Sequence, residues 1–317
     1  MTSTHESPLA LSVKPGRFNQ VFTEVPFTTT HHLPRGTRVR LFHLSVDTGE
    51  FTYKDLCSFI QKNVSNYVFS RAQIAGYVDT DEADMLSWDA SDQLRALEAE
   101  DPDILARQDR ETLGQILLYS FLEYVLGAPK VLSRFELDQI QGGRHSKADA
   151  LHLLPAVETG GVSQFVLGAS YIDTAPLTII DGAFDKIAKI KANRDNEVSI
   201  VEQTLLDKVF APNQLEAIER LIIPDPDGQP TYDTSYGIFV GYSLGLQLGG
   251  TRDTAAYRRD LDAKLRKDLI QHISYIADKI TECGLEHHDF HIYTLPLNDA
   301  RVDPSTIMSK TLRRRKP

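Results

Sequence analysis

A lysine and an aspartate, two residues apart, precede a short apolar run in the middle of the chain. Lys147 and Asp149 come just before Ala-Leu-His-Leu-Leu-Pro, a run that is typical of a buried strand. Because side chains two apart on a strand share one face, Lys147 and Asp149 are expected to point the same way. A carboxylate can hold a divalent metal, but it rarely does so tightly against water unless other ligands join it. Neighbouring elements would have to supply those ligands.

Two apolar runs joined by a glycine turn predict a β-hairpin that contains Asp149. The first run is residues 149–155, the turn contains Gly160 and Gly161, and the second run is residues 164–172. Residues 175–191 then have a helical pattern, and this helix is expected to pack across the hairpin. Restriction-type nucleases place their metal-binding acids and their lysine on a strand–turn–strand–helix unit of this kind.

A long apolar helix is predicted before the hairpin. Residues 111–126 are apolar on almost every side, which is typical of a central buried helix, and a glycine and a proline follow as stop signals. The remaining patterns predict strands at 37–46, 130–137, 236–246 and 290–297 and helices at 51–68, 198–210, 213–220 and 258–281. We therefore expect an α/β fold with a mixed sheet flanked by helices. Its predicted parts are an N-terminal extension with an acidic helical region (1–110), the α/β core (111–300) and a basic C-terminal tail (301–317).

The composition is that of an ordinary globular protein with an acidic balance. The 317 residues are 41% hydrophobic and 25% charged, and the formal net charge is −10. No apolar run approaches the roughly 20 residues that would span a bilayer, and no secretory signal is apparent. Cys57 and Cys283 have no paired spacing, so we expect free thiols in a reducing cytoplasm. Because Lys and Arg drive phosphate binding, the negative balance favours DNA that is delivered or shared by a partner.

Four stretches of the sequence stand out when they are taken in order. They are Leu-Gly-Gln-Ile-Leu-Leu-Tyr-Ser-Phe-Leu-Glu at 113–123 with Leu-Gly-Ala-Pro-Lys after it, Asp-Ala-Leu-His-Leu at 149–153, Phe-Val-Leu-Gly-Ala-Ser-Tyr at 165–171, and the strand around Pro296. Together they resemble the HamA family, the effector subunits of the Hachiman antiphage defence system. The resemblance covers roughly residues 105–300. It implies a restriction-endonuclease-like fold of the PD-(D/E)xK type, Mg²⁺ as cofactor, DNA as target, and a HamB-like superfamily 2 helicase as partner.

The resemblance also implies a catalytic set that this chain keeps only in part. The family site takes an acid from the central helix, an acid from the first hairpin strand, and Glu and Lys two apart on the second strand, where acids hold Mg²⁺ and lysine stabilises developing charge. The matching positions are Gln115, Asp149, Ala169 and Tyr171. An amide offers Mg²⁺ a neutral oxygen, alanine offers nothing, and tyrosine is not a cation. We expect a family-type site here, with Asp149 as its one acidic metal ligand, to be inactive or severely impaired.

Three explanations of this loss stay open. The chain is a natural pseudonuclease that keeps the fold for binding and regulation, or it cuts with relocated groups, or Ala169 is an engineered substitution. The candidates for relocation, besides Lys147, are Lys186 on the following helix and three acids, Glu123, Glu136 and Asp138. From a different class of function, a non-catalytic protein that restrains a helicase would use the acidic stretch 79–111 to dock a basic partner, although such a stretch is also typical of a solvated face.

The remaining polar motifs carry weaker signals. His287, Asp289 and His291 would share one strand face as a metal cluster, but a polar strand entry is the simpler interpretation. His152 is expected to be structural or to support Asp149 indirectly. The other motifs are His31-His32, which lacks a third metal ligand, Gly-Tyr-Ser-Leu-Gly at 241–245, which resembles a nucleophile elbow without a convincing acid and histidine, and the basic end at 313–317, which is typical of a solvated tail.

Overall fold

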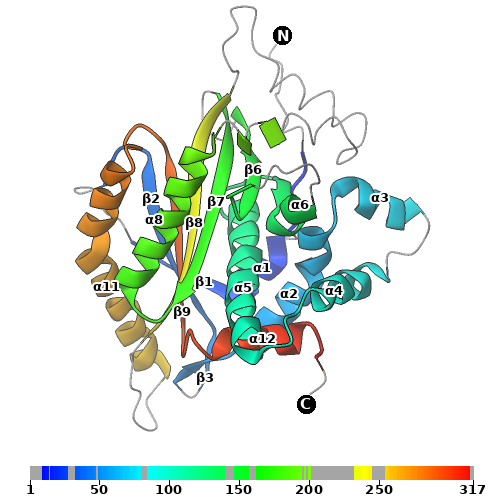
Figure 1. Cartoon of the computed structure of the whole chain (residues 1–317). Helices are drawn as coiled ribbons and strands as arrows, with labels where there is room; N and C mark the ends of the chain where they lie inside the picture. The colour runs from blue at the N-terminus through cyan, green and yellow to red at the C-terminus, as the bar shows by residue number, and fades with distance from the viewer. Residues whose placement is uncertain are drawn as a thin grey trace, which may run out of the picture.

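The computed structural model describes residues 9–13, 15–27, 33–47, 49–79, 84–139, 146–156, 162–194, 196–197, 199–200, 232–244 and 254–314. Within these residues a seven-stranded sheet carries helices on both faces (Figure 1). Some strand pairs are parallel and others antiparallel, so the predicted mixed α/β fold is confirmed.

The sheet places the predicted hairpin next to parallel strands. Its order is β1 (Phe22–Val25), β2 (Thr37–Leu44), β9 (Phe290–Leu297), β8 (Tyr232–Ser243), β7 (Ser163–Asp173), β6 (Ala150–Leu154) and β5 (Lys130–Ser133). The four strands from β2 to β7 run parallel to one another, whereas β1, β6 and β5 pair antiparallel to their neighbours. The predicted hairpin is confirmed as β6 and β7, with Ala150 opposite Gly168. A separate small ribbon consists of β3 (Val46–Asp47) and β4 (Glu50–Phe51).

Two layers of helices enclose this sheet. The central helix is α5 (Pro102–Tyr124), which packs on β7 and β8, and α8 (Pro176–Ala192) packs on the same two strands. In Figure 1, α8 and the long helix α11 (Thr254–Glu282) lie to the left of β7 and β8, and α5 lies to their right. Glycines let α5 approach closely, because a Cβ at Gly168 would lie 2.8 Å from Leu118 Cδ2 and one at Gly237 would lie 2.6 Å from Leu122 Cδ2.

Local signals explain where two predicted elements differ from the structure. The central helix begins earlier than residue 111, because the Asp101 carboxylate accepts the backbone N–H groups of Asp103 and Ile104 and Pro102 follows it. The predicted strand 130–137 was wrong in its second half. Ser133 N–H donates to Glu136, and Glu136 N–H donates to Ser133 Oγ, which is a capping box that starts α6 (Arg134–Gln139).

The remaining helices pack around α5 and the sheet edge. They are α1 (Pro15–Val21), α2 (Lys54–Val68), α3 (Arg71–Asp79), α4 (Leu86–Ala96) and α12 (Asp303–Thr311). Both predicted terminal parts, residues 1–110 and 301–317, contain residues that pack with the α/β core. β2 pairs with β9 within the central sheet, and Arg314 is not solvated as expected for the basic tail, because it forms ion pairs with Asp109 and Glu98. The predicted division at residue 110 stays a prediction.

Several predicted features lie outside the described residues. They are the helices at 198–210 (apart from residues 199–200) and 213–220, His31-His32, and the glycine turn of the hairpin. Among the helices that are described, none has the length and apolar character to cross a membrane.

Candidate functional site

The carboxylate of Asp149 is bound by donors from three different elements. Its Oδ2 atom accepts the backbone N–H of Ser170 at 2.7 Å, the Ser170 hydroxyl at 2.9 Å and the ammonium group of Lys186 at 2.8 Å. Its Oδ1 atom lies 3.5 Å from Gln115 Nε2, at the long end of hydrogen-bond distances. Asp149 is buried, with 4% of its surface exposed. Lys186 therefore compensates the charge of this carboxylate, and the donors from Ser170 and Lys186 occupy its Oδ2 atom.

Asp149 lies at an end of the sheet where side chains from both faces can reach its carboxylate. Asp149 comes just before β6, and its N–H donates to the carbonyl of Gly168 on β7. On the other side of β6, β5 ends at Ser133, opposite Ala150. Among the described residues no strand pairs with Asp149 on the β5 side, and side chains from α5 and from α8 both reach the carboxylate.

Gln115 connects Asp149 to a buried tyrosine. The Tyr67 hydroxyl donates to Gln115 Oε1 at 2.9 Å, while Gln115 Nε2 points to Asp149. Burial raises the pKa of Tyr67 well above its usual value, and the negative charge of Asp149 raises it further. Tyr67 therefore remains a hydrogen-bond donor at neutral pH, which fixes the amide with its NH₂ group toward Asp149. Sequence reasoning missed this tyrosine because it comes from α2, far away in the chain.

The other two family positions lie on the opposite face of the sheet from Gln115. Ser170 faces α5, since a Cβ at Gly114 would lie 3.1 Å from its hydroxyl. Strand alternation places Ala169 and Tyr171 on the α8 side, where the Tyr171 ring occupies the space that a side chain at Gly182 would need. Ala169 is fully buried and carries no polar atom. The structure thus brings Gln115 and Asp149 together, while Ala169 and Tyr171 contribute packing against α8.

Of the groups considered for relocation, Lys186 reaches Asp149. It lies one helical turn after Gly182 on α8, so its ammonium group comes to Asp149 from the face that Tyr171 occupies. The side chain of Lys147 is exposed, and its backbone N–H donates to Glu197 at 2.6 Å. Asp138 forms an ion pair with Arg134, whose guanidinium also donates to the carbonyls of Ser146 and Ala148. Arg134 therefore holds the segment that leads into Asp149.

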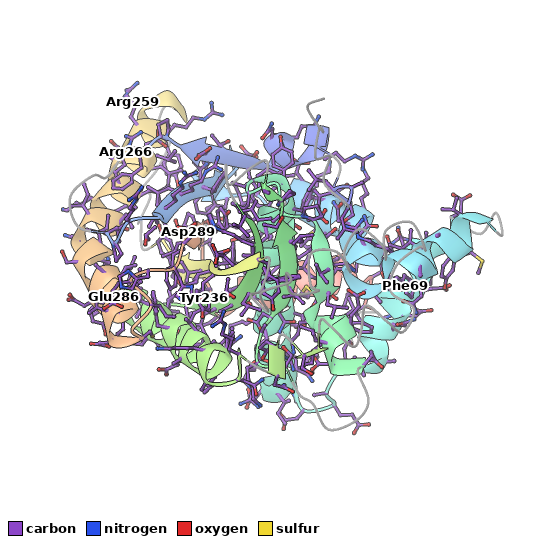
Figure 2. The ribbon with its side chains drawn as sticks, turned by 90° about the horizontal axis from the view of Figure 1, so that it is seen from above. Phe69, Tyr236, Arg259, Arg266, Glu286 and Asp289 are labelled. Atoms are coloured by element: carbon purple, nitrogen blue, oxygen red, sulfur yellow. The ribbon has the colours of Figure 1, made fainter. Side chains whose placement is uncertain are left out.

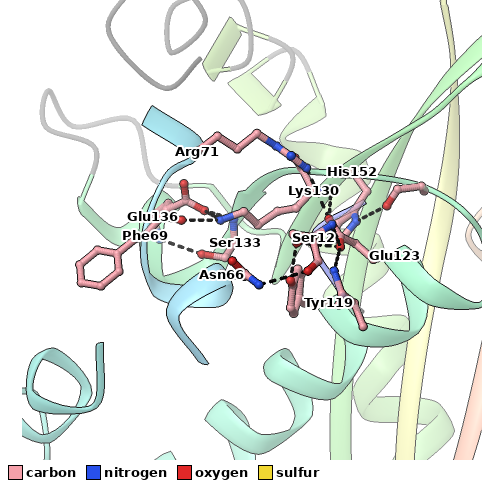
Figure 3. A network of polar contacts seen from close by, with 12 residues as sticks. Ser12, Asn66, Phe69, Arg71, Tyr119, Glu123, Lys130, Ser133, Glu136 and His152 are labelled. Atoms are coloured by element: carbon pink, nitrogen blue, oxygen red, sulfur yellow. Dashed lines mark hydrogen bonds and ion pairs between the residues drawn. The ribbon is translucent and has the colours of Figure 1, made fainter. Parts of the chain in front are cut away.

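The two remaining acids belong to a separate buried network, which Figure 3 shows. Glu123 accepts the N–H groups of Ser12, Val13 and Lys130 at 2.6 to 2.9 Å. Lys130 donates to Glu136 at 2.6 Å and to the carbonyl of Phe69 at 2.9 Å (Figure 3). These contacts fasten the N-terminal segment, α2, β5 and α6 together, so Glu123 and Glu136 act in the fold and not at Asp149.

The histidines singled out from the sequence also have structural surroundings. His152 Nδ1 lies 2.8 Å from the carbonyl of Ala128, and burial lowers its pKa to about 4, so the ring is neutral. Asp289, labelled in Figure 2, accepts the Gln164 amide at 2.9 Å. His291 is buried with its pKa lowered to about 4, and His287 is exposed. Asp289 and His291 line a hollow of about 290 Å³ that also contains Arg38 and Arg40.

The donor set at Asp149 does not fit Mg²⁺. Gln115 Oε1, the neutral oxygen that position 115 could offer, already accepts the Tyr67 hydroxyl, and Ala169 offers no ligand. Within the described ranges no group of three or more His, Cys, Asp or Glu side chains is arranged to hold a metal. A hard dication is held by several oxygen ligands, whereas Asp149 is one carboxylate that is already paired with an ammonium group.

The serine of the motif that resembles a nucleophile elbow makes a contact within the fold. Ser243 is the last residue of β8, and its hydroxyl accepts the N–H of Ala300 at 3.0 Å. This contact joins the end of β8 to the loop before α12.

Comparison with known proteins assigns the family. The sequence matches the HamA family over residues 18–310, nearly the whole chain. Neither the curated proteins nor the solved structures contain a match to it. The matched range includes Gln115, Ser170 and Lys186, which contact Asp149, as well as the N-terminal strands of the sheet. The chain belongs to the HamA family, and this membership identifies it as a subunit of the Hachiman antiphage defence system.

Proposed function

We propose that this chain is a non-cleaving subunit of a Hachiman complex. It keeps a restriction-endonuclease-like fold, binds a HamB-like superfamily 2 helicase, and meets phage DNA in the cytoplasm through that complex. The net charge of −10 supports DNA contact shared with the partner, because phosphate binding depends on Lys and Arg.

The observation that carries the proposal is the pairing of Asp149 with Lys186. In a metal-dependent nuclease, the acids repel one another until a dication neutralises them. Here Gln115 donates where a second acid would repel, and an ammonium group supplies the positive charge. In this proposal, Gln115, Asp149 and Lys186 serve to hold α5, the hairpin and α8 together.

A second candidate function follows from the same contact. A lysine next to an acid is also what a nuclease needs to stabilise developing charge, so Lys186 is positioned to replace the missing lysine at Tyr171. An active, relocated nuclease would then use Asp149 and Lys186, with further ligands from DNA or from the partner.

A cleavage assay separates the two candidates. The purified complex is incubated with supercoiled plasmid and Mg²⁺ or Mn²⁺, and Asp149→Ala and Lys186→Ala complexes are run beside it. We expect no cleavage above that of the two variants. Robust cleavage that disappears in both variants, while their assembly with the helicase is unchanged, would overturn the proposal and establish the relocated nuclease.

A further inference from the structure

Two arginines and two ring side chains form a square on neighbouring strands, away from Asp149. In the parallel register of β2 and β9, Arg38 lies opposite His291. Arg40 lies opposite Tyr293, two residues further along both strands. The guanidinium of Arg40 donates to the carbonyl of Val125 at the end of α5, so the square lies on the sheet face that α5 covers. We call these four residues the β2–β9 square.

The square forms one wall of the hollow of about 290 Å³, which opens where α5 ends. Val125, Leu126 and Leu154 form an apolar wall of the same hollow. Its volume is close to the lower limit of small-molecule sites, which is about 300 Å³. Leu154 is the last residue of β6 and Asp149 precedes the first, which separates them by roughly 17 Å of strand. The hollow is therefore distinct from the Asp149 site.

Two side chains of the square have polar groups that the described chain leaves without partners. His291 is 7% exposed, and neither of its ring nitrogens has a hydrogen-bond partner among the residues that the structure describes. Arg38 is exposed and forms no ion pair with any described residue. A buried polar group without a partner is costly, so such a group inside a hollow indicates a bound molecule.

The carboxylates near the square are already engaged. Glu24 holds Arg40 through two hydrogen bonds of 2.7 and 2.6 Å. Asp289, which Figure 2 labels, accepts the Gln164 amide on Oδ2, and a Cβ at Gly36 would collide with its Oδ1. Arg38 is therefore the cation of the hollow that no described carboxylate pairs, which favours an anionic ligand.

The two walls together indicate which anion fits. A guanidinium matches the oxygens of a phosphate group through two parallel hydrogen bonds. The imidazole of His291 adds one more donor or acceptor, depending on its tautomer. The apolar wall opposite gives a sugar or a base a surface to pack on, which inorganic phosphate would leave unused.

We propose that this hollow binds a nucleotide, with Arg38 and His291 at its phosphate and Leu126 and Leu154 against its sugar or base. The nucleotide is either free or the terminal unit of a nucleic-acid strand, because both present the same phosphate. This inference goes beyond the proposed function and does not depend on it, since the site lies within this chain and apart from Asp149.

The test is isothermal titration calorimetry of the full-length chain with deoxyadenosine monophosphate. We expect Arg38→Gln to weaken Kd at least tenfold, and Arg38→Lys to give an intermediate loss because an ammonium group keeps the charge without the fork. The matched control is Arg259→Gln, an exposed arginine on α11, which Figure 2 labels and which should bind within twofold of wild type. Circular dichroism checks that each variant is folded.

A second variant tests the apolar wall. Leu126→Trp narrows the hollow from the side opposite the arginines, so it should weaken the nucleotide more than inorganic phosphate. Two single-stranded oligonucleotides, with a 5′-phosphate and with a 5′-hydroxyl, distinguish the sources. Tighter binding of the phosphorylated strand than of the free nucleotide identifies a strand end, and the reverse order identifies a free nucleotide; both results support the site.

Three outcomes would contradict the inference. Wild type would bind neither the nucleotide nor the phosphorylated strand at millimolar concentration. Arg38→Gln would bind as tightly as wild type, which would place the phosphate elsewhere. Inorganic phosphate would bind as tightly as the nucleotide, and Leu126→Trp would affect both equally, which would reduce the hollow to a site for small anions.

Discussion

Replacing Lys186 with methionine should destabilise the protein, because it leaves a buried carboxylate without its cation. Breaking a fully buried ion pair costs about 3–5 kcal/mol. The Lys186 side chain is 26% exposed and Asp149 keeps both hydrogen bonds from Ser170, so we expect about 2 kcal/mol of lost unfolding free energy. Lys189→Met changes an exposed lysine on the same helix and should stay within about 0.5 kcal/mol of wild type.

A double-mutant cycle makes this prediction specific to the pair. Asp149→Asn alone should cost about 1–2 kcal/mol, because it removes the charge that Lys186 compensates. Combined with Lys186→Met it should cost less than the sum of the single changes, with a coupling of about 1 kcal/mol or more. Urea unfolding followed by circular dichroism measures each value. The direction in which Asp149→Asn changes the unfolding free energy is decisive. A metal site without its metal gains stability when an acid is removed, so an Asp149→Asn protein that is more stable than wild type would refute the reasoning.

Three further predictions concern the surrounding fold. Gly168→Ala should lower the unfolding free energy measured in urea by about 1–3 kcal/mol, because the new Cβ would lie 2.8 Å from Leu118. Gly76→Ala is the control: a Cβ there meets only open space, so this change should be neutral or stabilising. Equal effects of the two changes would contradict the close packing of α5. Arg314→Ala should cost about 3 kcal/mol by leaving Asp109 buried and unpaired, and a loss below 1 kcal/mol would show that the ion pair is dispensable. The pKa of His152 is about 4 in the folded state and about 6.5 in the unfolded state, so the unfolded state takes up a proton first as pH falls. His152 therefore contributes about 3 kcal/mol of unfolding free energy that is present above pH 6.5 and lost as pH falls to 4. His152→Gln should flatten this part of a profile of stability against pH, and an unchanged slope would contradict a buried neutral ring.

The periodic patterns of the sequence were sufficient for the main elements of the core. Apolar runs and turn glycines predicted β6, β7 and α8, and the nearly uniform apolar character of residues 111–126 predicted a buried α5. The family resemblance predicted that Gln115, Asp149, Ala169 and Tyr171 share one pocket. The structure brings Gln115 to 3.5 Å from Asp149, whereas Ala169 and Tyr171 lie on the α8 side of the sheet, so that prediction was right for the first pair and wrong for the second. The helices and strands depend on residues that are near one another in the chain, whereas the Gln115–Asp149 contact joins residues 34 positions apart.

The partners of Asp149 were harder to predict, since they depend on tertiary packing. Tyr67 reaches Gln115 from a segment that was assigned to an N-terminal extension. The side of the sheet on which Ser170 lies could have been predicted, because alternation along a strand puts its side chain opposite those of Ala169 and Tyr171. The Ser133 and Glu136 capping box was likewise visible in the sequence and would have ended the predicted strand at the right place.

The most direct test of the central claim is metal binding at Asp149. Mn²⁺ is titrated into the full-length chain and into Asp149→Asn, and bound metal is measured by electron paramagnetic resonance. If Lys186 has taken the place of the metal, the two proteins bind the same weak background at millimolar Mn²⁺. One tightly bound Mn²⁺ per chain in wild type that is lost in Asp149→Asn would contradict the account.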